Sequence, residues 1–161
     1  MPLQVSGLQN ELKNAFSEAH SSASLAGKDI ATAINNYIQG IQNAGGGTFN
    51  SCPGISSLGT TIGNIFDEQM VNGKLVGNRM ATEINSALQT IITTYQTGTP
   101  ITAAGLPGFL SDMQSLHDDK AQNGKLYGQQ LGTVINTFVS QFTIAGVIPG
   151  SPPVPFTGPV S

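Results

Sequence analysis

LAGKDIATAIN, at residues 25–35, recurs as LVGNRMATEIN at 75–85 and as LYGQQLGTVIN at 126–136. The alignment continues without a gap on both sides, and it preserves apolar residues at matching positions: Leu8/Leu58/Phe109, Leu12/Ile62/Met113, Ile34/Ile84/Ile135, Ile38/Leu88/Val139 and Ile41/Ile91/Phe142. The offsets of 50 and 51 residues between copies are typical of stacked supersecondary units. The sequence therefore predicts three tandem repeats, at 5–54, 55–105 and 106–150.

Each repeat carries two apolar stripes with helical spacing. In the first repeat one stripe includes Leu8, Leu12 and Phe16, and the other includes Ile30 and Ile34. Steps of three and four residues place such side chains on one face of an α-helix, whereas the two-residue alternation of strands is missing. We predict an all-α fold of three antiparallel helical hairpins, with helices near 8–22, 28–43, 58–71, 75–95, 109–122 and 126–143.

Short polar breaks separate the two helices of each hairpin. Asn72-Gly73 and Asn123-Gly124 suit the left-handed turn that ends a helix, and the first repeat has Ser21–Ser24 in the same place. A unit of about 50 residues is marginally stable alone, so we expect the three hairpins to share one core. Packing about a pseudo-threefold axis and packing as a short solenoid both satisfy the pattern.

The C-terminal residues have a different composition. Residues 146–161 contain five prolines, which exclude a helix and favour an extended, polyproline-like chain. We predict one helical domain at 1–150 and an extended tail at 151–161. Four apolar side chains in this region are our candidates for contact with a partner, although a frayed terminus is the alternative: Val147, Ile148, Val154 and Phe156.

Composition favours a protein that works in contact with other proteins. Only 9% of residues are charged and the net charge is −3, so assembly would desolvate few charges. The six Lys and Arg residues are scattered, which argues against direct nucleic-acid binding. We expect no membrane span and no secretory signal. The single cysteine, Cys52, fits folding in the cytosol.

A glycine recurs near the start of the second helix of each repeat, at Gly27, Gly77 and Gly128. Glycine lowers helix stability by about 1 kcal/mol relative to alanine, so its recurrence requires a reason. We predict close helix–helix crossings at these positions. The alternatives are a close approach to a ligand and a helix start.

A neutral polar stripe also recurs on the second helix. Its members lie three residues apart in every repeat, where their side chains could bond a neighbouring helix or subunit: Thr32 and Asn35, Thr82 and Asn85, and Thr133 and Asn136. The alternative is an ordinary solvated flank of the helix.

No residue set indicates catalysis. Acidic residues recur at Glu18, Glu68 and Asp119, and Asp67 and Asp118 directly precede two of them. Adjacent residues of a helix point apart, so these carboxylates are typical of a solvated face and not of a catalytic or metal-binding pair. His20 and His117 are not equivalent in the repeat, and with Cys52 they lack the spacing of a zinc site. Nucleophile elbows, phosphate-binding loops and dinucleotide motifs are missing. We therefore predict no enzymatic activity and no catalytic, metal-binding or cofactor-binding residues.

Two segments carry a family resemblance: MPLQVSGL at 1–8 and ATAINNYI at 31–38. They resemble small structural proteins of tailed bacteriophages. The resemblance implies a virion component that is made in the host cytoplasm and contacts other virion proteins in a symmetric multi-copy assembly. The alternative is a cytosolic adaptor or a secreted helical-hairpin protein that binds a protein partner. Type VII secretion substrates are such hairpins, but they carry a Trp-x-Gly turn and this chain has no Trp.

Overall fold

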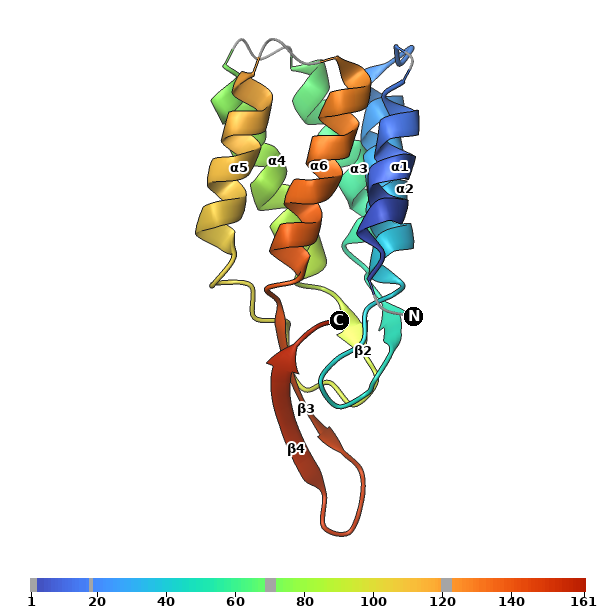
Figure 1. Cartoon of the computed structure of the whole chain (residues 1–161), viewed down its shortest axis with the longest axis vertical. Helices are drawn as coiled ribbons and strands as arrows, with labels where there is room; N and C mark the ends of the chain where they lie inside the picture. The colour runs from blue at the N-terminus through green and yellow to red at the C-terminus, as the bar shows by residue number, and fades with distance from the viewer. Residues whose placement is uncertain (1–2, 18, 69–71, 120–122) are drawn as a thin grey trace.

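The computed structural model describes residues 3–17, 19–68, 72–119 and 123–161, and it is mainly helical (Figure 1). The elements in chain order are α1 (Val5–Ala15), α2 (Ala23–Ile38), β1 (Phe49–Ser51), α3 (Ile55–Asp67), α4 (Gly73–Leu88), β2 (Ile92–Thr93), α5 (Leu106–Asp118), α6 (Gly124–Val139), β3 (Thr143–Ile148) and β4 (Val154–Pro159). The predicted predominance of helix is confirmed. The prediction of a purely α-helical fold is wrong, because two small antiparallel sheets are present.

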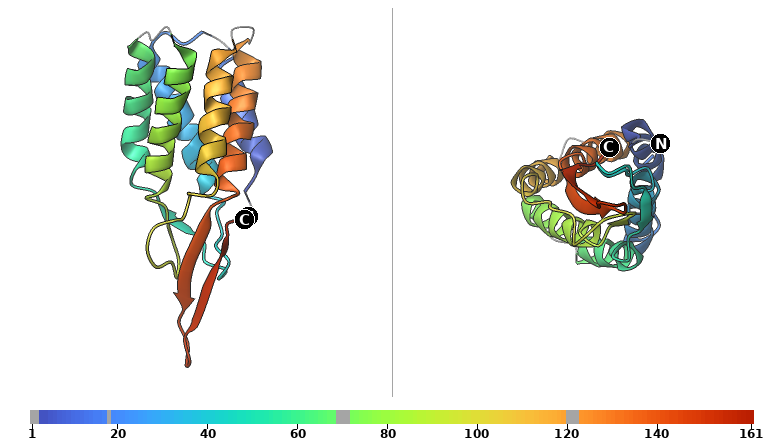
Figure 2. Two further views of the ribbon diagram at one scale, coloured as in Figure 1. Left: turned by 90° about the vertical axis from the view of Figure 1, so that its left-hand side faces the viewer. Right: turned by 90° about the horizontal axis from the view of Figure 1, so that it is seen from below.

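The six helices stand side by side around a common axis (Figure 2). The most extensive packing joins α2 to α3, α4 to α5, and α6 to α1, while contacts within the consecutive pairs α1–α2, α3–α4 and α5–α6 are fewer. Because α6 packs against α1, the helices form a closed ring. An open solenoid, in which the first and last helices stay apart, does not describe this structure.

The core fills the interior of the ring. Each helix contributes fully buried side chains at the apolar positions of the repeat alignment, among them Leu12, Ile34, Ile62, Ile84, Met113 and Ile135. The rings of Phe109 and Phe138 stack in parallel with their centroids 4.1 Å apart. The helical spacing of these residues is therefore what brings the six helices together, through burial of about 1.5–3 kcal/mol for each large apolar side chain.

The second helix of each pair begins with a side-chain cap. The side-chain oxygens of Ser22, Asn72 and Asn123 accept the backbone N–H of the residue three positions later. Such caps satisfy one of the free N–H groups at a helix start. The expectation that Asn72-Gly73 adopts a left-handed, helix-ending turn is wrong: Asn72 is extended, and Gly73 is the first residue of α4.

The second helices also end earlier than their apolar stripes suggest. They end at Ile38, Leu88 and Val139, before the apolar residues Ile41, Ile91 and Phe142. These three residues are nevertheless buried, because the N–H of each bonds the carbonyl three residues earlier in a tight turn. Periodicity alone does not distinguish such a turn from one more helical turn.

The C-terminal residues form a hairpin instead of the expected polyproline-like tail. β4 pairs with β3 in antiparallel register, from Thr143 opposite Pro159 to Ile148 opposite Val154. The predicted domain boundary at 150/151 falls in the turn of this hairpin. Figure 1 shows the hairpin projecting from the ring, at the end opposite the turns within the helix pairs.

The prolines of β4 are compatible with pairing because of where they lie. Thr143, Ala145 and Val147 direct their backbone groups to the segment 95–101 on the other side of β3. The backbone N–H and C=O groups of the β3 residues between them therefore point toward β4. In this register the backbone nitrogens of Pro155 and Pro159 point away from β3, to the free edge of the sheet. A proline, which lacks the N–H, is tolerated at an edge of this kind.

Candidate interaction surface

The three predicted helix-crossing glycines lie where neighbouring helix pairs meet. A Cβ at Gly27 would be 2.2 Å from the carbonyl oxygen of Gly59 on α3, and one at Gly77 would be 2.2 Å from that of Met113 on α5. At Gly128 the neighbour is the carbonyl oxygen of Leu12 on α1, 2.3 Å from the added Cβ. Backbone fills the space beside all three glycines, so no ligand fits there.

The polar stripe connects α6 to the first helix pair. Oδ1 of Asn136 accepts a 2.7 Å hydrogen bond from the hydroxyl of Tyr37 on α2. Oγ1 of Thr133 accepts a 2.9 Å hydrogen bond from the side-chain amide of Gln9 on α1. Both bonds lie within the chain, so at this junction the stripe fastens helices to one another.

The other members of the stripe have different surroundings. Thr82 bonds the carbonyl of Asn78 within its own helix. Asn85 is buried on α4, and its Oδ1 makes no hydrogen bond within the described residues. Thr32 and Asn35 line a surface groove between α2 and α3. One sequence pattern thus serves different purposes in the three helix pairs.

The four candidate partner-contact residues divide into two kinds. Val147 and Val154 are 39% and 54% exposed. Ile148 is half-buried. Phe156 is half-buried against the core, and its ring occupies the space that a Cβ on Gly146 would fill. Phe156 therefore stabilises its own fold, whereas the two valines remain available for contact.

Exposed large apolar residues lie at both ends of the ring: Leu25, Leu75 and Leu126 are in the first turns of α2, α4 and α6, and five others are on the elements near the hairpin. β2 and the segment 95–101 carry three of these five, in addition to Val147 and Val154, which lie on opposite faces of the hairpin because Val154 pairs with Ile148 and not with Val147. We call the five together the β-end surface, which thus spans more than one face of this end: Ile92, Tyr95, Ile101, Val147 and Val154. Backbone hydrogen bonds hold these elements together, from Val147 to Tyr95 and from Ile101 to Thr143. Ile92, Tyr95 and Ile101 could not be identified from the sequence, because nothing in its pattern distinguishes an exposed loop residue from a buried one.

Asn43 organises the loops beneath this surface. Its side-chain amide donates to Thr93 Oγ1 and to the carbonyl of Thr94, each at 2.8 Å. Its Oδ1 accepts the backbone N–H groups of Gly45 and Gly47. A buried amide with both ends satisfied gives a loop one defined conformation. The Asn-Ala-Gly-Gly-Gly stretch is a turn signal from which this role could have been predicted.

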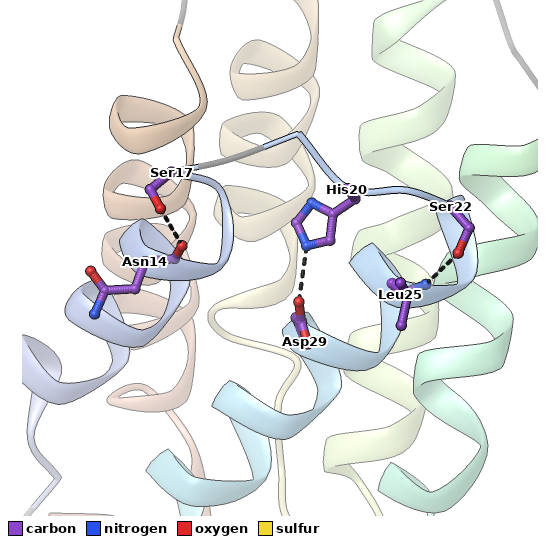
Figure 3. Close-up of polar contacts among 6 residues, drawn as sticks. All are labelled: Asn14, Ser17, His20, Ser22, Leu25 and Asp29. Carbon is purple, nitrogen blue, oxygen red and sulfur yellow. Dashed lines mark hydrogen bonds and ion pairs between the residues drawn. The ribbon is translucent and has the colours of Figure 1, made fainter.

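The opposite end of the ring carries polar contacts that join the start of α2 to the turn before it (Figure 3). His20 Nε2 lies 2.9 Å from Asp29 Oδ2, and Ser22 Oγ caps α2 through the N–H of Leu25. Farther along the chain, Arg79 pairs with Glu68 on the surface. Glu18 lies outside the described residues, and Asp119 is exposed. The His20–Asp29 contact and the Arg79–Glu68 pair each join the second helix of a pair to the residues that precede it.

His117 is half-buried on α5, and both nitrogens of its ring lie within hydrogen-bond distance of a partner. Nδ1 lies 2.8 Å from the carbonyl of Met113 and Nε2 lies 2.9 Å from the hydroxyl of Tyr127. Because a carbonyl can only accept, Nδ1 carries the proton, and the neutral ring accepts from Tyr127 at Nε2. Burial lowers the pKa of His117, partly offset by the bond to Met113.

Within the residues that the structure describes, no group of three or more His, Cys, Asp and Glu side chains is placed to hold a metal ion. In the same residues, no helix has the length and apolar character that a membrane crossing requires. No family model matches the chain, and comparisons with curated proteins and with solved structures return no match.

Proposed function

We propose that this protein is a non-enzymatic structural or assembly component of a bacteriophage virion and that it acts through protein–protein contacts. The observation that carries the proposal is the β-end surface. Five large apolar side chains are exposed on elements that a hydrogen-bonded framework holds in place. Large apolar side chains that stay exposed on ordered elements are typical of contact sites.

The shape of the molecule and its low charge support the same function. A closed ring of helices is a rigid support, and the hairpin extends the contact surface away from it (Figure 2). With only 9% charged residues in the chain, docking this end desolvates few ions. The resemblance of residues 1–8 and 31–38 to phage structural proteins suggests virion proteins as the partners.

We further infer that the three helix pairs are copies of one ancestral hairpin. This inference is supported by the equivalent glycines, each of which packs against the backbone of the next pair in the ring. It is also supported by the equivalent caps at Ser22, Asn72 and Asn123. A pseudo-threefold ring of this kind suits a symmetric multi-copy assembly.

Mass spectrometry of purified particles of the phage that encodes the chain tests the proposal. We expect peptides of the protein in the particles, in more than one copy per particle. Their absence from every purified particle would contradict a virion role.

A matched pair of variants tests the contact surface. Val154→Asp should reduce incorporation into particles at least about tenfold, because an interface residue of this kind contributes about 1–2 kcal/mol and a buried carboxylate adds a desolvation penalty. Leu75→Asp changes a side chain that is similarly exposed, 49% against 54%, at the other end of the ring, and it should be incorporated normally. The reverse result would assign the interface to the other end.

A further inference from the structure

A cavity of about 500 Å³, shallow and broadly open to solvent, lies at the end of the ring opposite the hairpin. Side chains from five of the six helices and their caps line it, so it lies between helix pairs and not within one. Its volume is within the range of small-molecule sites. The predicted contact residues lie elsewhere, and the proposed virion role does not involve this cavity.

Aromatic rings form much of the cavity wall. Phe16 meets Tyr127 edge to face with centroids 4.9 Å apart, and it meets His20 at 5.0 Å. Tyr127 is edge-on to His117 in turn, at 5.4 Å. Phe66 adds a ring from α3. A wall of tilted rings offers faces and edges that favour another planar aromatic group over a saturated one.

The polar groups of the cavity indicate a neutral ligand with a hydrogen-bond acceptor. His117 and Tyr127 satisfy each other, which leaves that part of the wall apolar in character. Ser22 and Asn123 also line the cavity, and their oxygens accept backbone N–H groups. The Ser22 hydroxyl proton and the Asn123 amide protons make no hydrogen bond to a described residue, so both groups can donate to a ligand. Among the residues that the structure describes, the wall includes the carboxylate of Asp119 and no Lys or Arg, so the described part of the wall offers no cation to an anion.

We propose that this aromatic-walled cavity is a binding site for a small, neutral, planar aromatic molecule that carries a hydroxyl or carbonyl oxygen. The rings of Phe16, Phe66 and Tyr127 would contact its faces and edges. Ser22 and Asn123 would donate to its oxygen.

The test uses 2-naphthol, a planar bicyclic compound with one hydroxyl group. Because the chain has no Trp, 2-naphthol fluorescence anisotropy can be read separately from protein emission. We expect saturable one-to-one binding with a Kd of about 1 mM or below, as ordinary ligand efficiencies give for a ligand of this size. Decahydro-2-naphthol, the saturated analogue, is measured by its displacement of bound 2-naphthol. It should bind about threefold more weakly or worse. Non-saturable 2-naphthol binding or equal affinity for the two compounds would overturn the proposal.

Two tyrosine substitutions at equivalent repeat positions locate the site. Residue 26 is equivalent to residues 76 and 127, which are Val76 and Tyr127; Ala26 lines the cavity, and Val76 does not. Ala26→Tyr should fill the cavity and reduce 2-naphthol affinity at least about tenfold, because it occupies the ligand volume. Val76→Tyr should bind as the parent chain does. Binding that survives Ala26→Tyr, or that both variants lose, would place 2-naphthol elsewhere and overturn the proposal.

Phe66→Leu is a second variant that removes one ring with little change of volume. It should weaken 2-naphthol binding about threefold, with the helical circular dichroism of the parent chain unchanged. Unchanged affinity in this variant would contradict the role of the aromatic wall.

Discussion

The hydroxyl of Tyr37 donates a 2.7 Å hydrogen bond to Oδ1 of Asn136, which lies 99 positions farther along the chain. Tyr37 is buried on α2 and Asn136 is half-buried on α6. The bond therefore joins the first helix pair to the last, near the junction where α6 packs against α1.

Tyr37→Phe should lower the free energy of unfolding by about 0.5–1.5 kcal/mol, because the half-buried Asn136 loses its hydrogen bond from the Tyr37 hydroxyl. Burial raises the pKa of the Tyr37 hydroxyl, so the donor remains protonated at any pH used for the measurement. Urea denaturation followed by circular dichroism measures the change. Tyr95→Phe, at an exposed tyrosine, is the control and should have no effect. Equal stability of the two variants would show that the bond contributes nothing.

Gly77→Ala should destabilise the protein by about 2 kcal/mol or more, because two helices must move apart to admit the methyl group. The added Cβ would lie 2.2 Å from the carbonyl oxygen of Met113. Gly108→Ala is the matched control, since no atom lies within 4 Å of its added Cβ and alanine is the better helix former. It should be neutral or should stabilise α5 by up to about 0.5 kcal/mol. A Gly77→Ala variant as stable as the parent chain would contradict the close crossing.

Deleting residues 149–161 should reduce stability by about 3 kcal/mol or more, because the deletion removes the buried side chain of Val160 and the half-buried ring of Phe156 from the core. It also removes the backbone bonds between Ser161 and Gln42. A thermal melt followed by circular dichroism measures the loss. The control is Val154→Ser, which changes an exposed residue of the same strand and should stay within about 0.5 kcal/mol of the parent chain. An unchanged melting temperature after the deletion would mean that β4 is dispensable for the fold.

His117 should make stability fall in mild acid. Burial lowers its pKa in the folded chain below the ordinary value of 6.5, so below that pH the unfolded chain binds a proton that the folded chain does not. This contribution is fully present above pH 6.5 and is lost progressively as the pH falls to the folded pKa, with a slope of at most about 1.4 kcal/mol per pH unit.

His117→Phe tests this pH dependence, because phenylalanine occupies the equivalent positions 16 and 66. Urea denaturation at a series of pH values between about 7.5 and 5 should show a shallower acid loss for the variant than for the parent chain. Parallel profiles would show that His117 is not the group responsible.

Helix content and core positions could be predicted from the sequence because they follow from local periodicity. Ile34, Ile84 and Ile135 recur at the same place in a helical stripe, and all three are fully buried. Packing between helix pairs depends on long-range geometry. The position of Gly128 indicates a close approach, but only the folded ring shows that its neighbour is Leu12, more than a hundred residues away.

The hairpin could not be predicted for a different reason. Thr143–Ile148 and Val154–Pro159 are short, and prolines in the second strand argue against a strand when each segment is considered alone. Pairing with the segment 95–101 turns the prolines toward the free edge, and only the tertiary structure supplies that partner. Likewise, the folded chain alone decides which residues of β2 and of the segment 95–101 stay exposed, because this depends on which loops cover one another. The aromatic-walled cavity combines Phe16, Phe66 and Tyr127 from three different helix pairs, and no local pattern joins them.

The contact between Gly128 and Leu12 also limits how this chain can evolve in length. Linear repeat arrays gain or lose a unit at little cost, because every unit touches only its neighbours and the terminal units can be capped. In this ring the last pair needs the first, so removing one pair would leave one glycine without its neighbouring backbone and one backbone face without its glycine. A fourth pair would have to separate α6 from α1 before it could enter. Duplication or deletion of a single unit should therefore prevent folding. A circular permutation, in which one linker is cut and the original termini are joined, would keep every helix next to the same neighbours.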